Sequence, residues 1–130
     1  MSSESSAVAV VRRLYASGMA PEVTAEVMAA DLVWDISPGF PHGGVYGGWE
    51  SVGRDFFGKL APSYESFSAQ PEEFFLAGGD RVVVTGHYRA VAVSGSVADV
   101  RFVHLWTVRA GKITRLWQVA DSHVARELAR

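Results

Sequence analysis

Cysteine is missing from this 130-residue sequence, which excludes disulfides, thiolate metal sites, iron–sulfur clusters and a cysteine nucleophile. Long hydrophobic runs are missing too, since none approaches the ~18 residues of a membrane-spanning helix, and no leader-like segment opens the chain. We therefore expect a soluble, cytoplasmic protein. Twelve Lys and Arg are scattered among fourteen Asp and Glu, so no basic stripe is available for phosphate backbones. Nucleic acid is not an expected partner.

The composition is that of one globular domain over residues 1–130, with 48% hydrophobic residues and no change of composition along the chain. A chain of this length buries roughly two-thirds of the surface that it exposes when unfolded. We therefore expect a core that needs no metal or disulfide to hold it together.

Apolar residues at three- and four-residue steps predict three helices in the first half of the chain. The first covers residues 4–16, and a short second helix follows Pro21, which suits a first helical turn. A strand over residues 31–36 leads into an irregular loop rich in Pro and Gly. The third helix then covers residues 49–60 and ends before Pro62.

The second half of the sequence changes to strand patterns separated by glycine turns, and we expect strands over residues 67–77, 81–93, 97–108 and 113–120. The first of these contains Pro71, which favours a kink or an edge position. Helices followed by antiparallel strands are typical of an α+β domain whose helices pack on one face of a curved sheet.

Gly95-Ser96 between two strand patterns predicts a two-residue type II′ turn, which wants Gly first. In that register His87 lies opposite His104, with Thr85 opposite Trp106, and all of them share one face of the sheet. Two facing imidazoles are then either a functional pair or two sheet histidines whose nitrogens are satisfied by neighbouring hydroxyls or water.

The turn at residues 110–111 leaves two registers open. A two-residue loop places Trp117 opposite His104, whereas a three-residue loop that ends at Gly111 places Leu116 there. The second is the commoner form for a glycine in the last loop position, and it brings Gln118 onto the face of the histidines.

Several short motifs occur in a particular order along this layout. They are Asp31-Leu-Val-Trp34, Pro38-Gly39, Tyr46-Gly-Gly-Trp-Glu-Ser-Val52, Gly79-Asp80, His104-Leu-Trp106 and Gly111-Lys-Ile113. Together they resemble the nuclear transport factor 2-like superfamily, and within it the SnoaL-like branch, which includes polyketide cyclases. The resemblance implies a cone-shaped barrel, in which a strongly curved antiparallel sheet wraps on three N-terminal helices around an apolar cavity. It leaves function open, because this superfamily hosts isomerases, hydrolases, dehydratases and non-catalytic binding modules.

The resemblance carries over to single positions with a mixed result. The carboxylic acid that donates to the oxyanion in ketosteroid isomerase corresponds to His104, and the essential aspartate of limonene epoxide hydrolase corresponds to Gln118. The Arg and Asp on that hydrolase's other strand correspond to Thr85 and His87, while Asp35 falls on the face away from the cavity. Neither of those two mechanisms is therefore expected here.

The candidate site follows from the register and the resemblance together. We expect His87 and His104 to handle protons and Gln118 to orient them, because a desolvated imidazole is neutral and can act as a base. No metal ion is expected, since a third ligand at suitable spacing is not evident. The expected substrate-binding residues, whose alternative explanation is a filled core, are Tyr15, Trp34, Ile36, Phe56, Thr85, Phe102, Trp106 and Leu116.

The function that these residues predict is a cofactor-independent acid–base enzyme that cyclises, isomerises or dehydrates an apolar, polyketide-like small molecule in a hydrophobic pocket. A non-catalytic small-ligand binding protein and an assembly module with a filled cavity are the alternatives. His42 in the irregular loop is expected at the cavity mouth or in solvent, and Asp121 as the cap of a terminal helix. Apolar residues on the second face, including Val103 and Leu105, predict a homodimer.

Overall fold

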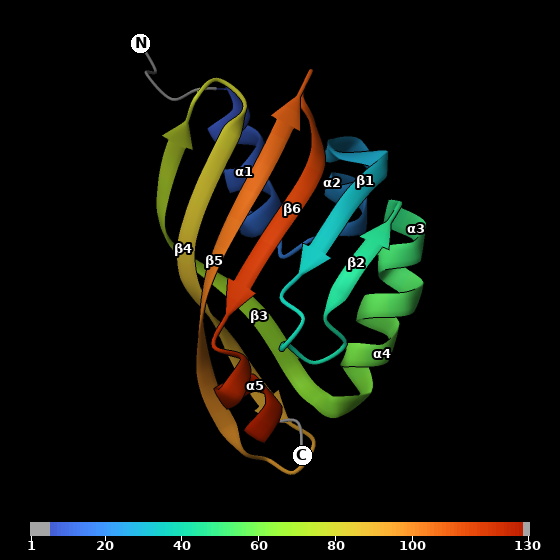
Figure 1. The fold of residues 1–130 in the computed structure, drawn as a ribbon, viewed down its shortest axis with the longest axis vertical. Coiled ribbons are helices and arrows are strands. Elements are labelled where there is room, and N and C mark those ends of the chain that lie inside the picture. Colours follow the sequence, from blue (N-terminus) through green and yellow to red (C-terminus); the bar gives the residue numbers. More distant parts are fainter. Residues whose placement is uncertain (1–5, 129–130) are drawn as a thin grey trace.

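A six-stranded sheet covered by helices on one side forms the architecture of the computed structural model, which describes residues 6–128 (Figure 1). Two helices come first, α1 (Ser6–Ala16) and α2 (Pro21–Val27), as the amphipathic pattern predicts. The predicted start of the first helix at Glu4 lies outside the described residues. No helix within residues 6–128 is long and apolar enough to cross a membrane.

The strands are arranged in the order β2-β1-β6-β5-β4-β3, in a sheet that is curved but not closed. Only β1 and β6 pair in parallel, and all other neighbours are antiparallel. The α+β prediction is therefore confirmed. The edge position of β3 is also as predicted, with an irregular ladder beside Pro71. The bounds are β1 (Met28–Ile36), β2 (Gly44–Gly47), β3 (Tyr64–Ala77), β4 (Arg81–Ala92), β5 (Val97–Arg109) and β6 (Lys112–Ala120).

The third predicted helix is a continuous helical segment with a change of geometry in its middle. It consists of α3 (Trp49–Ser51), a π-helical stretch (Val52–Phe57), α4 (Gly58–Leu60) and a 3₁₀ turn (Ala61–Ser63). The Gly58 N–H reaches the carbonyl of Gly53, five residues back, which widens the helix at this point. The C-terminal helix α5 (Ser122–Leu128) begins after Asp121, whose side chain accepts the Val124 N–H at 3.2 Å, as predicted for a cap.

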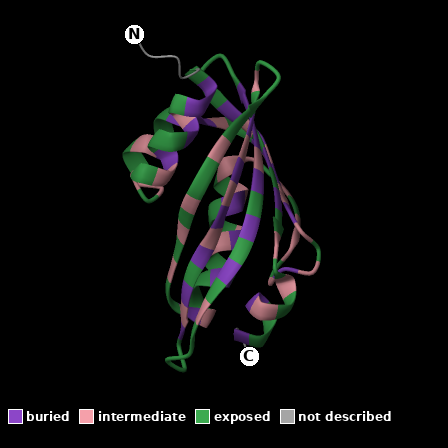
Figure 2. Cartoon of the chain, turned by 90° about the vertical axis from the view of Figure 1, so that its left-hand side faces the viewer, coloured by how far each residue is buried: buried purple, intermediate pink, exposed green. Residues whose placement is uncertain are grey.

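Burial alternates along the central strands, as Figure 2 shows by its purple and green bands. On β4, for example, the even-numbered residues, among them Val82, Val84 and Ala90, are buried and face the helices, while the odd-numbered residues lie on the outer face. The inner face of the curved sheet therefore forms the core together with α1 and the segment over residues 49–63.

The predicted register between β4 and β5 is wrong. The turn has three residues, Val93-Ser94-Gly95, and Gly95 takes the last position with φ +92°. Its N–H donates to the Ala92 carbonyl at 2.9 Å, as in a type I turn closed by a glycine bulge. Because a shift by an odd number of residues exchanges the faces, His104 lies opposite Val84, and His87 lies opposite Arg101 on the outer face.

The register between β5 and β6 also differs from both predicted forms. The loop has two residues, Ala110 and Gly111, at φ +51° and +76°, and an irregularity then leaves Thr114 unpaired. This extra residue places Gln118 directly opposite His104. Gln118 thus shares the face of His104, but through a bulge in β6 and not through a three-residue loop.

Candidate active site

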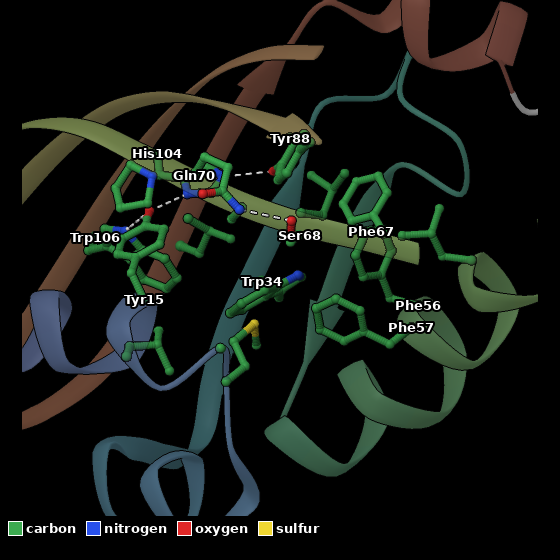
Figure 3. A pocket seen from close by; sticks show the side chains of 18 of the residues that line it. Tyr15, Trp34, Phe56, Phe57, Phe67, Ser68, Gln70, Tyr88, His104 and Trp106 are labelled. Carbon is green, nitrogen blue, oxygen red and sulfur yellow. Dashed lines mark hydrogen bonds between the residues drawn. The ribbon is translucent and has the colours of Figure 1, made fainter. Parts of the chain in front are cut away.

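A cavity of about 570 Å³ lies between α1, the helical segment over residues 49–63 and the inner face of the sheet. Aromatic side chains supply a large part of its wall, and Figure 3 shows how they come from separate elements. The π-helical stretch lets two consecutive residues, Phe56 and Phe57, both line it. The other large aromatic side chains of the wall are Tyr15, Trp34, Phe40, Phe67, Tyr88 and Trp106.

His104 is the polar centre of this wall, and one side of its ring meets α1. Its Nδ1 forms a short hydrogen bond with the hydroxyl of Tyr15, which also accepts the indole N–H of Trp106 at 2.9 Å. Tyr15 faces the cavity because α1 packs its apolar stripe, including Val11 and Leu14, against the sheet. The sequence prediction that Tyr15 contributes to the pocket wall is consistent with this position.

The other side of the His104 ring meets β4 and β6. Its Nε2 lies 2.6 Å from the hydroxyl of Tyr88, and the amide nitrogen of Gln118 donates to the same hydroxyl at 2.9 Å. The Gln118 oxygen accepts the backbone N–H of Ser37 at 3.3 Å. That N–H also donates to the Gln118 backbone carbonyl at 3.1 Å, and because it can only donate, the side-chain oxygen of Gln118 faces Ser37 and the amide nitrogen faces Tyr88.

Burial determines the charge of this cluster. His104 is 4% exposed, and burial lowers its pKa from 6.5 to about 3. Burial also raises the pKa of Tyr15 and of Tyr88, more strongly than the hydrogen bonds from Trp106 and Gln118 lower them. The imidazole and both phenols are therefore neutral at pH 7.

Charged side chains are scarce around the cluster. No carboxylate of the described chain lines the cavity, and its charged lining residue is Arg12, whose guanidinium lies 4.1 Å from the centre of the Phe74 ring. Within residues 6–128 no group of three His, Asp or Glu side chains is placed to hold a metal ion. The wall therefore provides neutral hydrogen-bonding groups, with one cation.

The buried imidazole makes a specific prediction for stability against pH. An unfolded chain takes up a proton at His104 below about pH 6.5, whereas the folded chain does not until about pH 3, so stability falls as the pH decreases through this window. The slope is about 1.4 kcal/mol per pH unit for one residue. In urea unfolding, we expect the wild type to lose roughly 2–3 kcal/mol more unfolding free energy than His104→Gln when the pH is lowered from 6.5 to 4.5. A constant difference would contradict a neutral His104.

An aromatic contact from behind helps to hold His104 in place. The ring of Phe102 stacks on the imidazole with 3.8 Å between centroids and 9° between planes, and Phe102 is 1% exposed. It approaches β4 at Gly86, where a Cβ would lie 2.9 Å from its Cζ atom. Phe102 was predicted as a wall residue, but it supports the imidazole from behind and does not line the cavity.

The remaining predicted residues divide by face. Trp34, Ile36, Phe56, Trp106 and Leu116 line the cavity, and their ligand contacts stay a prediction. Gln118 is buried beside Tyr88 and does not line it.

His87 and Thr85 were predicted at the site and are not there, because the longer turn after Ala92 puts both on the outer face. On that face the Nδ1 of His87 lies 2.9 Å from a Glu72 carboxylate oxygen. Asp35 likewise faces outward and accepts a hydrogen bond from Arg115 at 3.0 Å. His42 is exposed in its loop and is not part of the cavity wall.

Tyr88 is a candidate site residue that the sequence did not predict. The predicted two-residue turn placed Tyr88 on the outer face of the sheet. Reading Gly95 as the last residue of a three-residue turn would have placed Tyr88 on the inner face. Phe40 and Phe67 were missed for another reason. Phe40 lies in the irregular loop, where no periodicity marks an inward side chain, and Phe67 lies on the edge strand.

Trp34 carries a buried polar atom that the predicted apolar role did not include. Its indole nitrogen is the buried side-chain atom of residues 6–128 that has no hydrogen-bond partner. The ring packs edge-on against Trp49, Phe57 and Trp106. The Trp34 side chain is thus held by packing and not by a hydrogen bond of its own within the described residues.

This difference between the two tryptophans can be measured. Trp34→Phe removes no hydrogen bond, whereas Trp106→Phe removes the donor to Tyr15. With similar loss of ring volume, we expect Trp106→Phe to lower the free energy of unfolding by about 1 kcal/mol more than Trp34→Phe. Denaturant unfolding of both variants checks this, and a larger loss in Trp34→Phe would show that its N–H has a partner.

A model of the SnoaL-like domain matches residues 11–116. No curated protein matches the chain. TerC, co-crystallised with polyporic acid, is 28% identical, with a TM-score of 0.86 over 96% of this chain and 98% of that chain.

Two further solved structures have the same fold. An NTF2-like protein of unknown function from Burkholderia pseudomallei K96243 is 27% identical, with a TM-score of 0.85 over 97% of this chain and 98% of that one. A putative SnoaL-like polyketide cyclase from Jannaschia sp. CCS1 is 20% identical, with a TM-score of 0.79 over 95% and 91% of the two chains. With the matched family model covering most of the sequence, the chain belongs to the SnoaL-like domain family, within the NTF2-like fold.

Proposed function

We propose that this protein is a cofactor-independent acid–base enzyme that cyclises, isomerises or dehydrates an apolar small molecule with an enolisable carbonyl group. The observation that carries the proposal is the neutral imidazole of His104, which is bonded on both nitrogens to phenols in the wall of the cavity. A neutral imidazole can accept a proton at one nitrogen while it gives one up at the other, and a phenol held by fixed donors can stabilise a developing oxyanion. The aromatic wall would bind the apolar body of the substrate.

The proposed roles differ from those that the sequence suggested. His104 keeps its role in proton transfer, but its partners are Tyr15 and Tyr88 in place of His87. Gln118 acts as a positioning residue, because its amide holds the Tyr88 hydroxyl and does not reach the cavity. Arg12 at the cavity wall favours a neutral or anionic oxygen on the substrate over a cationic group.

The similarity to TerC supports an apolar small molecule as the ligand of this chain. That protein was co-crystallised with polyporic acid, and it is similar to this chain over almost the whole length of both. Polyporic acid is therefore a reasonable first binding probe, and quenching of the fluorescence of the cavity tryptophans would report its binding.

Deuterium exchange tests the proposed activity without knowledge of the natural substrate. The probe is 2-tetralone in D₂O, a bicyclic aromatic ketone whose α-hydrogens exchange only through an enol or enolate. We expect the protein to accelerate this exchange, as followed by proton NMR. If 2-tetralone binds, as seen by fluorescence quenching, and its exchange rate stays at that of buffer, the acid–base proposal is wrong for this ligand class.

A non-catalytic ligand-binding protein is the second candidate, and the wall's composition favours it because most of its lining side chains are apolar. It would bind 2-tetralone or polyporic acid without accelerating exchange. Replacing His104 would then change affinity alone. The exchange experiment therefore separates the two candidates directly.

We propose a homodimer through the outer face of the sheet, with a second copy as the occupant. Val103, Trp117 and Val119 are 37–43% exposed there, and Val103 pairs with Val119 across β5 and β6. The stripe is flanked by the Arg115–Asp35 ion pair, so two copies related by a two-fold axis can match opposite charges.

The dimer proposal predicts a change in mass. In sedimentation equilibrium we expect the wild type at twice its 14.1 kDa chain mass at micromolar concentration. Val119→Glu combined with Trp117→Glu should give a monomer that keeps its near-UV circular dichroism, because a charge buried in the interface is costly. A monomeric wild type at this concentration would refute the proposal.

A further inference from the structure

The hydrogens of the polar cluster can be counted, because its two outer donors are fixed. The Trp106 indole can only donate, and it gives its hydrogen to the Tyr15 oxygen. The Gln118 amide nitrogen gives a hydrogen to the Tyr88 oxygen, since the Ser37 N–H holds the other end of the amide. Each phenol oxygen therefore accepts one bond before His104 is considered.

His104 makes two bonds with only one ring hydrogen. A neutral imidazole donates from one nitrogen and accepts at the other, while Tyr15 lies at Nδ1 and Tyr88 at Nε2. One of the two bonds therefore uses the ring hydrogen and the other uses a phenol hydrogen. The cluster is left with one phenol hydrogen that takes no part in these bonds.

Two arrangements satisfy this count. When Tyr15 donates to Nδ1, the ring hydrogen on Nε2 goes to Tyr88, whose own O–H is then unused. When Tyr88 donates to Nε2, the ring hydrogen on Nδ1 goes to Tyr15, and the Tyr15 O–H is unused. In each arrangement one phenol has a spare hydrogen and the other has a spare lone pair, and both residues line the cavity.

We infer that Tyr15, His104 and Tyr88 form a tautomeric relay, which presents one proton donor and one proton acceptor to a bound molecule and exchanges these two roles when His104 changes tautomer. The relay fits a ligand with a carbonyl oxygen at one phenol and an acidic O–H or C–H, conjugated with that carbonyl, at the other. This inference rests on the proposed function and narrows it to proton transposition, that is, to isomerisation.

The number of protons on the cluster is unchanged after one round of proton transfer. Tyr88 gives its spare hydrogen to the ligand's carbonyl oxygen and takes the hydrogen of Nε2. Nδ1 takes the hydrogen of Tyr15, and Tyr15 takes a hydrogen from the ligand's acidic position. The ligand gains one proton and loses one, so it leaves as its tautomer, while the cluster stays neutral and ends in the other arrangement. No hydroxide, metal ion or redox partner is required.

Nitrogen-15 NMR of His104 in two variants tests the relay without a ligand. In Tyr15→Phe we expect the ring hydrogen on Nε2, where Tyr88 can still accept it, because an orphaned buried N–H is less tolerable than an orphaned lone pair. In Tyr88→Phe we expect it on Nδ1, where Tyr15 accepts it. The His104 signals are assigned by their loss in His104→Gln. The same tautomer in both variants, or a charged ring at pH 7, would overturn the relay.

Site-specific 3-fluorotyrosine keeps the experiment decisive where a phenylalanine variant fails to fold. Fluorine makes the phenol a better donor without removing its oxygen. The label at position 15 should therefore favour the hydrogen on Nε2, and the label at position 88 should favour it on Nδ1. Equal tautomer ratios in the two labelled proteins would overturn the relay. Because no ligand is present, this result is independent of the deuterium exchange that tests the proposed function.

Discussion

Replacement of His104 by glutamine is expected to lower the rate of deuterium exchange into 2-tetralone by roughly 10²–10⁴-fold, the range for loss of a positioned general base. Glutamine keeps a polar group between Tyr15 and Tyr88 but cannot carry a proton from one to the other. Affinity for the probe should change by only a few-fold, since the aromatic wall is intact. The measurement is the exchange rate at saturating protein, followed by NMR.

The matched control is His87→Gln. His87 lies on the outer face beside Glu72, so this variant should keep the exchange rate within about two-fold and the unfolding free energy within about 0.5 kcal/mol of the wild type. The two histidines belong to neighbouring strands and differ in the face that they occupy. Equal rate losses in both variants would show that the site has been placed on the wrong face.

Gly86→Ala is expected to cause the largest loss of stability, roughly 2–4 kcal/mol. An added Cβ would lie 2.3 Å from the Gln70 carbonyl oxygen and 3.1 Å from the Cα of Pro71, so the β3–β4 ladder must separate. The same Cβ would press on Phe102, the ring that stacks on His104. We therefore expect a lower urea midpoint and a displaced imidazole in the same variant.

Gly79→Ala is the control for this prediction. Gly79 lies in the turn between β3 and β4, and a Cβ there meets no atom within 4 Å. Its unfolding free energy should stay within about 0.5 kcal/mol of the wild type. If Gly86→Ala were as stable as Gly79→Ala, then β3 and β4 would not approach each other as closely as the structure has them.

Helices and strands could be predicted because burial leaves a period in the sequence. Val11 and Leu14 mark the inner side of α1, and Val82 and Val84 mark the inner face of β4. The family resemblance then supplied the curved sheet and the apolar cavity. The positions of the strands along the sequence were thus predictable, whereas the pairing of residues between neighbouring strands was not.

Register depends on single residues in turns, and this is where prediction failed. A glycine such as Gly95 satisfies a two-residue turn as its first residue and a three-residue turn as its last, and both forms are energetically acceptable. The choice moved His87 out of the site and Tyr88 into it. The unpaired Thr114 in β6 has no sequence signal at all, although it sets Gln118 opposite His104.

A neutral imidazole bridges two phenols in the wall of the cavity, and a pH titration of the His104 ring nitrogens by nitrogen-15 NMR reports directly on its charge. We expect His104 still to show one protonated and one bare nitrogen at pH 5, since burial lowers its pKa to about 3. Two protonated nitrogens on His104 at that pH would contradict it, because a charged ring can accept no proton from a ligand.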